Sequence, residues 1–416
     1  MKFAADLHLH SRFSRATSIN MNIRALDAWA RVKGIKILGT GDFTHPEWLS
    51  ELNRDLEPAE PGLFKLKGKN SPTRFLLSAE VSCIYSKNGQ VRKIHIVVYA
   101  PTIEVVEKIN ARLSRIGNLT GDGRPILGLD AKELVKIVLD ASQQCLVVPA
   151  HAMTPWFGIF GSKSGFDSLQ ECFEDYTKYI YAIETGLSAD PEMLWRIPDG
   201  RRVALISNSD AHSPQKLARE ANIFDTGIDY FEIIEAIKSK DPKKFLYTIE
   251  FFPAEGKYHF DGHRACNASF SPQESKRYNG NCPVCGRELT IGVVNRIEEL
   301  ADRPEGYKPP GAIPFKHFVP LQEIIADALK VMTASKQVQM EYDNLVKNFG
   351  SEFAVLLGPS RADLEKVSLP EIAEGVIRVR EGRVSVIPGY DGVFGKIKIF
   401  DDEIVAKATG KQKKLF

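Results

Sequence analysis

The sequence opens with acidic and imidazole side chains at every second position, in Asp6-Leu7-His8-Leu9-His10. In an extended segment every second side chain lies on the same side, so Asp6, His8 and His10 share one face. Two imidazoles on one face can chelate a metal ion, and a nearby carboxylate can orient one ring or bind the metal itself. The motif alone is weak evidence, because buried and surface histidines also occur at this spacing.

Further candidate ligands recur along the first 250 residues, within or directly after apolar runs. These residues are Asp42, Glu80, His95, His151, Asp210 and His212. Because the carboxyl ends of parallel strands meet at one face of a barrel, we expect these side chains to converge there. The alternative is a set of satisfied core histidines in capped turns, which chance would scatter rather than repeat at strand ends.

The residue types in this set predict the kind of metal ion. Imidazoles with bridging carboxylates suit Zn²⁺, Mn²⁺, Fe²⁺ or Ni²⁺ more than cations bound by oxygen alone. Two or more such ions can lower the pKa of a bound water and stabilise attacking and leaving oxygens, which is the chemistry of phosphoester hydrolysis. We predict two or three divalent transition-metal ions, with Mg²⁺ as the other candidate.

Short β-branched runs alternate with longer amphipathic segments in this part of the chain. The candidate strands are Lys2–Asp6, Ile35–Thr40, Arg74–Val81, Lys93–Tyr99, Cys145–Pro149, Tyr181–Glu184 and Val203–Ser207. Candidate helices are Ile23–Val32, Asp130–Ala141 and Pro191–Arg196. Strands separated by helices predict an α/β fold with a parallel sheet, and seven strands fit a barrel better than an open sheet.

The composition is that of a soluble globular protein, with 43% hydrophobic and 26% charged residues and a net charge of +2 over 416 residues. Neither a membrane-spanning apolar run nor a signal pattern is present, so we expect a cytoplasmic protein. Composition shifts divide the chain into a barrel at 1–250, a zinc-finger module at 251–312, a mainly helical segment at 313–400 and a flexible basic tail at 401–416. Short strands in the helical segment are predicted at Val376–Val379, Val384–Ile387 and Lys396–Ile399.

A cluster of cysteines lies in the second of these segments. His263 and Cys266 form one pair with two intervening residues, and Cys282 and Cys285 form another pair that is followed by glycine. Cys-x-x-Cys with a following glycine is typical of a zinc knuckle, in which backbone N–H groups stabilise the thiolates. We predict one structural Zn²⁺ bound by these four side chains, with His259 as the competing fourth ligand.

The motifs of the barrel together resemble the polymerase and histidinol phosphatase (PHP) superfamily. The segments that carry the resemblance are DLHLHS, GTGDFTHP, SAEVSC, KIHIVVYAP, VPAHAMTPWFG and SNSDAHS. Members are distorted seven-stranded (β/α) barrels with di- or trinuclear metal centres, so the resemblance implies that fold and two ions that share Glu80. The implied ligands are His8, His10, Glu80 and Asp210 for the first ion, and Glu80, His95 and His151 for the second.

The third metal site of the superfamily departs from its pattern in this chain. His212 is retained, but the positions of two further histidines hold other residues. Those residues are Arg15 or Ala16, and Phe43. Asp42 or His45 could substitute as a ligand, or Arg15 could contact a phosphate instead, so occupation of a third site stays open.

The second half of the chain makes the resemblance more specific. Three segments, together with the barrel motifs, resemble the endonuclease Q family across essentially the whole chain. These segments are KYHFDGHRACN, CPVCGRELTIG and PPGAIPFKHFVPLQEII. That family nicks DNA on the 5′ side of uracil, hypoxanthine and xanthine, and at abasic sites. The resemblance implies a DNA-repair endonuclease that leaves 3′-hydroxyl and 5′-phosphate ends, with Glu80, Asp210 and His212 as catalytic residues.

A lesion-specific nuclease needs a pocket for an everted base and a surface for the DNA backbone. The loop after His151 offers Trp156 and Phe157 to stack on a base and Lys163 to approach a phosphate. Packing of the two aromatic side chains within the loop is an equally good interpretation.

The expected partner is double-stranded DNA with a deaminated base, bound by a monomer that needs no membrane. The tail residues Gln412–Phe416 resemble a shortened PCNA-interacting motif for the sliding clamp, although Lys-rich tails with apolar ends are common. One alternative function is a small-molecule phosphatase of the histidinol-phosphate type, which needs no zinc module. Another is a non-enzymatic DNA-binding adaptor with a degenerate barrel, which the intact ligand sets oppose.

Overall fold

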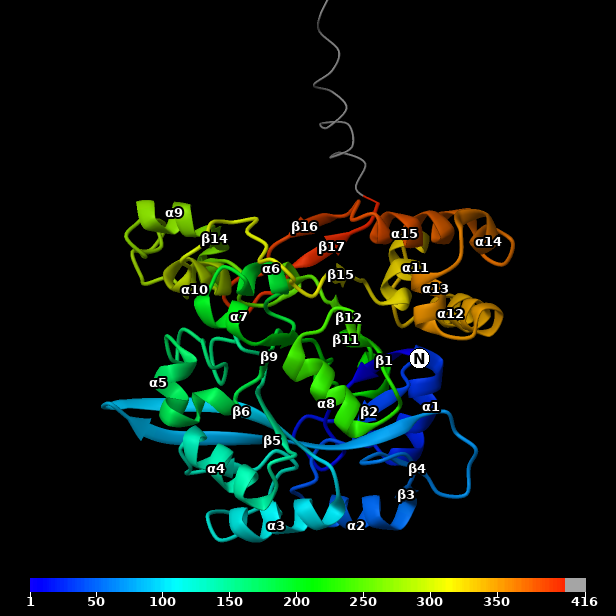
Figure 1. The fold of residues 1–416 in the computed structure, drawn as a ribbon. Helices are drawn as coiled ribbons and strands as arrows, with labels where there is room; N and C mark the ends of the chain where they lie inside the picture. The colour runs from blue at the N-terminus through cyan, green and yellow to red at the C-terminus, as the bar shows by residue number, and fades with distance from the viewer. Residues whose placement is uncertain (401–416) are drawn as a thin grey trace, which may run out of the picture.

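One mixed β-sheet forms the centre of the computed structural model, which describes residues 1–400 (Figure 1). Its main strands are β1 Lys2–Asp6, β2 Ile37–Gly39, β5 Arg74–Lys87, β6 Gln90–Ala100, β8 Leu146–Pro149, β11 Ala221–Asp225, β12 Phe245–Glu250 and β15 Phe315–His317. The hydrogen-bonded path runs β15-β12-β11-β1-β2-β5, and β6 and β8 continue from β5. Three short strands extend the sheet beyond β5, namely β3 Leu56–Pro58, β4 Phe64–Leu66 and β7 Ile126–Leu127.

Two further strands close the strand order into a ring. β9 (Ala182–Glu184) and β10 (Ala204–Ile206) pair in parallel, apart from the large sheet. Ala152 N donates to the Glu184 carbonyl O at 2.9 Å, which joins β9 to the end of β8. Ser209 N donates to Asp6 Oδ1 at 3.0 Å, which joins the end of β10 to β1. Loops and side chains therefore make both joints, and the strand ends at these joints are the ones that carry candidate ligands.

The predicted parallel sheet is wrong for part of the barrel, because β5 and β6 form a long antiparallel hairpin and β6 also pairs antiparallel with β8. The hairpin turns at Asn88 and Gly89, with φ of 53° and 74°. Two successive residues with positive φ are the requirement of a type I′ turn, for which Asn-Gly is a favoured pair. His95 consequently lies within an antiparallel strand, opposite Ser82, rather than at the end of a parallel one.

Eight helices accompany the barrel strands in the described part of the chain: α1 Ile23–Lys33, α2 Pro46–Asp55, α3 Ile103–Leu113, α4 Ala131–Ala141, α5 Leu169–Phe173, α6 Pro191–Leu194, α7 Pro198–Arg202 and α8 Tyr230–Ser239. Asn22, Asp130 and Asp229 begin α1, α4 and α8 by accepting hydrogen bonds from backbone N–H groups of the first turn. On α4, Leu134, Val135 and Val138 are buried against the core, as expected for a helix with one apolar face.

The segment predicted to be a zinc-finger module, called the module below, and the C-terminal helices lie on one side of the barrel (Figure 1). The module contains β13 Asp261–His263, β14 Ala268–Phe270, α9 Pro272–Arg277 and α10 Val293–Leu300. The following helices are α11 Leu321–Leu329, α12 Lys336–Phe349, α13 Glu352–Leu357, α14 Arg361–Glu365 and α15 Pro370–Arg380. The chain then forms a hairpin of β16 Ser385–Ile387 and β17 Lys396–Lys398.

Two segments cross the predicted domain boundaries. β15, which lies beyond the predicted module, pairs in parallel with β12 of the barrel sheet. The loop of the β16–β17 hairpin returns to the module, where Phe260 N donates to the Gly389 carbonyl O at 2.9 Å. The strand predicted at Val376–Val379 is wrong, because these residues lie inside α15. Its buried positions Ile372, Val376 and Val379 follow the helical period, and the β-branched side chains misled the prediction.

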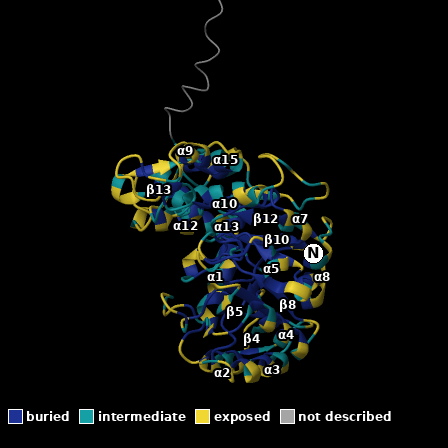
Figure 2. Cartoon of the chain, turned by 90° about the vertical axis from the view of Figure 1, so that its left-hand side faces the viewer, coloured by how far each residue is buried: buried dark blue, intermediate teal, exposed yellow. Residues whose placement is uncertain are grey.

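The buried residues gather in the barrel, whereas much of the module is exposed or half-buried (Figure 2). The small cluster of buried hydrophobic residues in the module consists of Ala268, Cys282 and Leu289. Across residues 1–400, no helix combines the length and apolar character needed to cross a membrane. The predicted tail and its clamp motif lie outside the described residues.

Candidate metal centre

Ligand atoms of the first motif meet those of Asp210 inside the barrel. His8, His10 and Asp210 each offer one atom, and these atoms all lie within 4.8 Å of one another. Asp210 Oδ1 is 3.2 Å from His10 Nε2 and 3.8 Å from His8 Nε2. Backbone hydrogen bonds hold the two segments together: Asp210 N donates to the His8 carbonyl O, and His10 N donates to the Ala211 carbonyl O, each at 3.0 Å.

A second group forms around Glu80, where Glu80, His95 and His151 offer atoms within 4.8 Å of one another. Glu80 Oε1 lies 2.9 Å from His95 Nδ1 and 3.1 Å from His151 Nε2. The other oxygen, Oε2, lies 3.2 Å from His10 Nε2. One carboxylate thus faces both groups, which is the geometry of a bridging ligand.

The donor atoms of these groups fit divalent transition-metal ions. His8 Nε2, His10 Nε2 and Asp210 Oδ1 are buried without a hydrogen-bond partner among the described residues. Because an unpaired buried polar atom costs free energy, their convergence indicates a ligand that satisfies them. Burial disfavours the imidazolium form of His95 and lowers its pKa to about 4, which leaves the neutral ring with a lone pair. Imidazole and carboxylate donors together suit Zn²⁺, Mn²⁺, Fe²⁺ or Ni²⁺.

Buried acids behind the first two imidazoles fix their orientation. His8 Nδ1 lies 3.0 Å from Glu184 Oε2, and His10 Nδ1 lies 2.9 Å from Asp42 Oδ1. A ring nitrogen that donates to a carboxylate leaves the other nitrogen, Nε2, to bind a metal. Burial by itself would lower the pKa of both imidazoles, but Glu184 and Asp42 outweigh burial and raise the pKa of His8 and His10.

Asp42, a predicted metal ligand, has both of its oxygens engaged elsewhere. Oδ1 faces His10, and Oδ2 accepts hydrogen bonds from Ser11 N at 2.6 Å and from the Ser14 hydroxyl at 2.9 Å. These hydrogen bonds, which the linear sequence does not reveal, favour an orienting role for Asp42 over the expected ligand role.

The two other residues considered for a third ion also face away from the cluster. His45 Nε2 lies 3.2 Å from the Thr120 carbonyl O, and its ring stacks on Phe13. The Arg15 side chain is 78% exposed and pairs with Asp122 at 3.4 Å. His45 Nδ1 is buried without a hydrogen-bond partner among the described residues, but it belongs to neither group of converging ligand atoms in the barrel, and Arg15 lies at the surface.

His212 lies at the open edge of the cluster. Its ring centroid is 4.7 Å from that of His10, and its Nδ1 is 2.9 Å from the Asp210 carbonyl O. Its side chain is 32% exposed. Burial lowers the pKa of His212, so the ring is neutral near pH 7. A neutral ring with Nδ1 occupied can use Nε2 to accept a proton or to bind a metal.

Three residues of the centre have strained backbone conformations. Asp42, His151 and Asp210 have φ of 49°, 31° and 47°. Such conformations cost about 1–3 kcal/mol each and persist where the surrounding structure imposes them, often at functional sites. Nearby, Gly186 (φ 64°) passes so close to His151 that an added Cβ would lie 2.5 Å from the His151 Cβ.

The loop after His151 supports both interpretations of its aromatic residues. The Phe157 ring centroid lies 4.2 Å from that of His95, so Phe157 packs on a predicted ligand. Trp156 is 38% exposed, and its ring meets that of Tyr258 at 5.3 Å, which joins the barrel loop to the module. Lys163 is exposed on the same loop. Phe157 therefore packs within the structure, while Trp156 and Lys163 stay accessible.

One charged residue of the centre was missed in the sequence. Arg124 Nη1 donates to Glu80 Oε2 at 3.1 Å from a loop that connects α3 and β7. Neither hydrophobic period nor a ligand motif singles out Arg124, because only the fold brings its loop to the cluster. Glu184 ends a predicted strand. Its contact with His8 had one local signal in the sequence, a charged residue directly after an apolar run.

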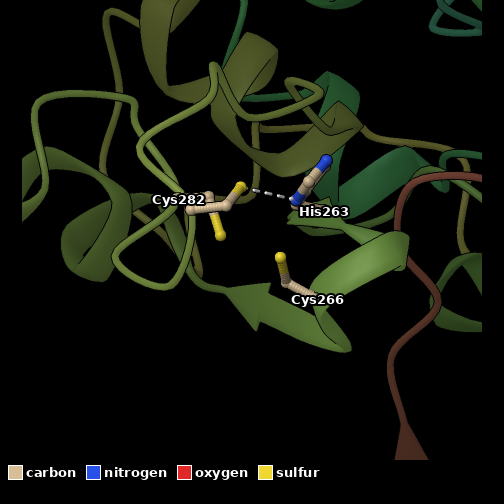
Figure 3. A group of neighbouring side chains, drawn as sticks. His263, Cys266 and Cys282 are labelled. Carbon is tan, nitrogen blue, oxygen red and sulfur yellow. Dashed lines mark hydrogen bonds between the residues drawn. The ribbon is translucent and has the colours of Figure 1, made fainter.

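His263, Cys266 and Cys282 point toward one another in the module (Figure 3). Together with Cys285 they offer four atoms within 4.8 Å of one another, and Cys285 Sγ lies 3.4 Å from His263 Nδ1. Burial opposes ionisation of Cys282, but backbone N–H groups of Cys285 and Val284 outweigh it and lower the pKa of this thiol to about 6. This donor set is that of a closed tetrahedral zinc site. The competitor, His259, lies outside the group.

A pocket of about 510 Å³ lies between the barrel and the module. Its lining includes Asp190, Phe252, His259 and His317. His317 Nε2 lies 3.1 Å from Asp190 Oδ2, and the His317 ring stacks on Phe252 at 4.7 Å. Gly186 lies against His151 and Asp190 lines the pocket, so a short segment of chain connects the ligand cluster with the pocket.

Comparisons with known proteins agree with this arrangement. A family model described as the MJ0043 C-terminal domain matches residues 320–383. The chain is 30% identical to YqxK of Bacillus subtilis over 412 residues, which are 95% of this chain and 99% of YqxK. It is 35% identical to MJ0043 of Methanocaldococcus jannaschii over 254 residues, and it spans only 31% of the length of that protein.

Two solved structures resemble the whole chain. The lesion-specific endonuclease PfuEndoQ from Pyrococcus furiosus has a TM-score of 0.86 and 31% identity, with 100% of both chains covered. Endonuclease Q in complex with a 27-mer duplex that carries an abasic lesion has a TM-score of 0.85 and 32% identity, with 97% and 98% covered.

The fold and these likenesses define a metal-dependent endonuclease, a hydrolase of ester bonds. Within that class, the chain belongs to the endonuclease Q family.

Proposed function

We propose that this protein is a DNA-repair endonuclease that hydrolyses the phosphodiester 5′ to a deaminated base or an abasic site. The products are a 3′-hydroxyl and a 5′-phosphate, and the deaminated bases are uracil, hypoxanthine and xanthine. The observation that carries the proposal is the pair of ligand groups that share Glu80, in a fold that matches endonuclease Q over its full length.

The barrel residues would hold two metal ions. His8 Nε2, His10 Nε2, Asp210 and Glu80 would bind one, and Glu80, His95 and His151 would bind the other. When bound, such a pair of ions lowers the pKa of a water molecule and neutralises charge on the phosphate oxygens. His212 Nε2, at the open edge, is the candidate to accept a proton from the nucleophile.

The pocket beside Asp190 is the candidate acceptor of an everted base. Its 510 Å³ falls within the range of sites that enclose small ligands, and aromatic and polar side chains line it together. The Gly186–Asp190 segment connects His151 with this pocket, which supports a role of the pocket in holding the base of a nucleotide whose phosphate lies at the ligand cluster. Deaminated and abasic positions favour eversion, since their pairing in the duplex is weaker.

The zinc-finger module and the helical segment are proposed to hold the duplex. Trp156 against Tyr258 and the bonds of Arg296 support this, because they fix the module on the barrel beside the candidate base pocket. Arg296 donates to the Phe160 carbonyl O at 3.0 Å and pairs with Asp167. Exposed Trp156 and Lys163 would then face the DNA near the lesion.

The tail segment Gln412–Phe416 is proposed as a contact for the sliding clamp, on its sequence alone. Deletion of these residues should abolish binding to the clamp in a pull-down with purified clamp, without change in nicking of naked DNA. Equal binding by the truncated and full chains would contradict the proposal.

The test of function is a nicking assay on matched duplexes. One strand carries uracil, hypoxanthine, xanthine or an abasic analogue at a single position, and the control duplex is undamaged. We expect one nick immediately 5′ to each lesion, none in the control, and none with Asp210→Asn. Extension of the nick by a DNA polymerase reports the 3′-hydroxyl. Equal cleavage of undamaged duplex, or a nick 3′ to the lesion, would overturn the proposal.

A further inference from the structure

The loop of residues 121–124 carries a guanidinium into the metal centre. Arg124 Nη1 donates to Glu80 Oε2 at 3.1 Å, and its side chain is 24% exposed. This is the one hydrogen bond that the guanidinium makes to the residues of the described chain. A guanidinium has five N–H donors, so most of them have no hydrogen bond to the described residues.

The loop is built to hold Arg124 in this place. Gly123 N donates to the Phe13 carbonyl O at 3.0 Å, and the Thr44 hydroxyl donates to the Gly123 carbonyl O at 3.1 Å. An added Cβ at Gly123 would lie 2.4 Å from Asp42 Oδ2, so only glycine permits this approach. The loop therefore lies directly against the residues that orient His10.

Asp122 completes the anchoring. Its carboxylate is almost buried, and Oδ1 accepts hydrogen bonds from Arg15 N at 3.3 Å and from Arg124 N at 3.1 Å. These contacts join the Arg124 loop to the segment that follows the first motif. Two independent attachments, at Gly123 and at Asp122, thus fix the direction from which Arg124 enters the centre.

The same two segments, around Arg15 and Phe43, are those at which ligands for a third ion were expected. Phe43 is fully buried in the core, and Arg15 is at the surface. Asp42 is saturated by hydrogen bonds, and His45, whose Nε2 faces the Thr120 carbonyl O, has an unpartnered Nδ1 on which no other ligand atoms converge among the described residues. Among residues 1–400, the barrel holds two groups of converging ligand atoms, and neither includes these positions. The residues present do not fit a third metal ion.

We propose that the guanidinium of Arg124 replaces the third ion and binds a non-bridging oxygen of the scissile phosphate. This inference rests on the proposed phosphodiesterase function. One N–H holds the shared carboxylate of Glu80, and the remaining donors of this partly exposed side chain are left for the phosphate. Arginine suits this task because its charge is permanent and its planar donors match phosphate oxygens in pairs.

Substitution of Arg124 in the metal-loaded full-length protein tests the proposal. Arg124→Ala should lower kcat for nicking by about 10²–10³-fold, the cost typical of a lost transition-state donor. Arg124→Lys should retain part of the activity, since it keeps the charge but not the paired donors. Arg112→Ala, an exposed arginine of α3 paired with Asp140, is the control with wild-type activity.

Three readouts separate phosphate binding from a merely structural role. Metal content of Arg124→Ala should stay at the wild-type value, and millimolar guanidinium chloride should restore part of its activity. Inorganic phosphate should bind the metal-loaded wild type at least tenfold more tightly than Arg124→Ala. Loss of a metal ion from Arg124→Ala, no rescue by guanidinium, or equal phosphate affinity would overturn the assignment.

The phosphate measurement also distinguishes this inference from the proposed function. If wild-type protein binds phosphate through Arg124 but does not nick lesion-bearing duplexes, the lesion-specific function fails and the assignment of Arg124 stands. If the wild type nicks 5′ to lesions and Arg124→Ala nicks at the same rate, the assignment of Arg124 fails and the function stands.

Discussion

The two groups of metal-ligand side chains are built in opposite ways. In the barrel, the side chains of His10 and Glu80 are 0% exposed, and carboxylates hold the imidazoles from behind. In the module, Cys285 is exposed, and the buried cluster separate from the main core consists of Ala268, Cys282 and Leu289 among the described residues, while Val293 and Ile297 of α10 join the main core. Packing therefore positions the candidate ligands of the barrel, whereas the module has a small buried cluster of its own and depends more on its predicted zinc site.

The largest effect expected from this difference is loss of the module when its zinc is removed. Structural zinc contributes on the order of 10 kcal/mol to the folding of such small units. We expect Cys285→Ser to lose one zinc per chain and to make residues 264–290 sensitive to protease, while the barrel stays resistant. Val284→Ser, at an exposed position between two ligands, is the matched control. A protease-resistant module in zinc-free Cys285→Ser would contradict the comparison.

Loss of a barrel ligand should lower activity and leave the fold intact, the reverse of the effect expected for the module. Asp210→Asn removes an anionic donor from a site that packing holds in shape, so nicking should fall by about 10³-fold with little change in the melting temperature. Thermal unfolding and single-turnover nicking measure the two quantities together. Asp140→Asn, an exposed residue in a surface ion pair, should match the wild type in both. If Asp210→Asn unfolds, the barrel depends on its ligands for folding as the module does. If it nicks at the wild-type rate, Asp210 is not needed for activity. Either result would contradict the comparison.

An intermediate effect is expected from the acids behind the imidazoles. Asp42→Asn weakens the hold on His10 Nδ1 without removing a ligand atom, so metal affinity should fall by about 10–100-fold. Glu184→Gln should cause a similar loss through His8. Competition with a chelator gives the affinities. Unchanged affinity in both variants would show that orientation by these acids is unimportant, and complete loss of one ion in Asp42→Asn would return Asp42 to a ligand role.

The smallest expected effect, taken per unit of pH, concerns a buried acid of the barrel that takes no part in the ligand groups. Burial raises the pKa of Glu250 to about 8, although hydrogen bonds from Thr248 and Thr185 oppose the shift. The native state therefore keeps a proton that the unfolded chain releases above its ordinary pKa. The free energy of unfolding should fall as pH rises from about 5 to 8, by no more than ~1.4 kcal/mol per pH unit from this group.

Glu250→Gln should flatten that part of the pH profile, as measured by chemical denaturation at pH 6, 7 and 8. Glu235→Gln, on the exposed face of α8, should keep the wild-type slope. An identical slope in wild type and Glu250→Gln would show that Glu250 is ionised in the folded protein at neutral pH.

The sequence predicted the features that depend on local spacing. The alternation around His8 and His10, the Cys-x-x-Cys pair and the seven predicted strands have local signals. Six of these strands occur at nearly the predicted bounds, whereas β5 continues past Val81 to Lys87, and β11 and β12 were not predicted. The ligand roles themselves stay predictions. Strand direction was not predicted correctly, although Asn88-Gly89 is a local signal for the β5–β6 hairpin.

Features that depend on contacts between distant segments could not be predicted from the sequence. The orienting role of Asp42 requires that Ser11, Ser14 and His10 surround it, and no spacing indicates this. Arg124 reaches Glu80 only because its loop docks on the segments after β1 and β2. Both cases have the same physical origin, because a charged side chain acquires its role from the buried partner that the fold places beside it.

The central claim is that the barrel holds two metal ions that share Glu80, while the module holds one zinc for structure. Anomalous diffraction from crystals of the metal-loaded protein tests it most directly. We predict two peaks on either side of Glu80, one peak among His263, Cys266, Cys282 and Cys285, and none between Arg124 and Asp42. A single peak in the barrel, or a third one between Arg124 and Asp42, would contradict the account.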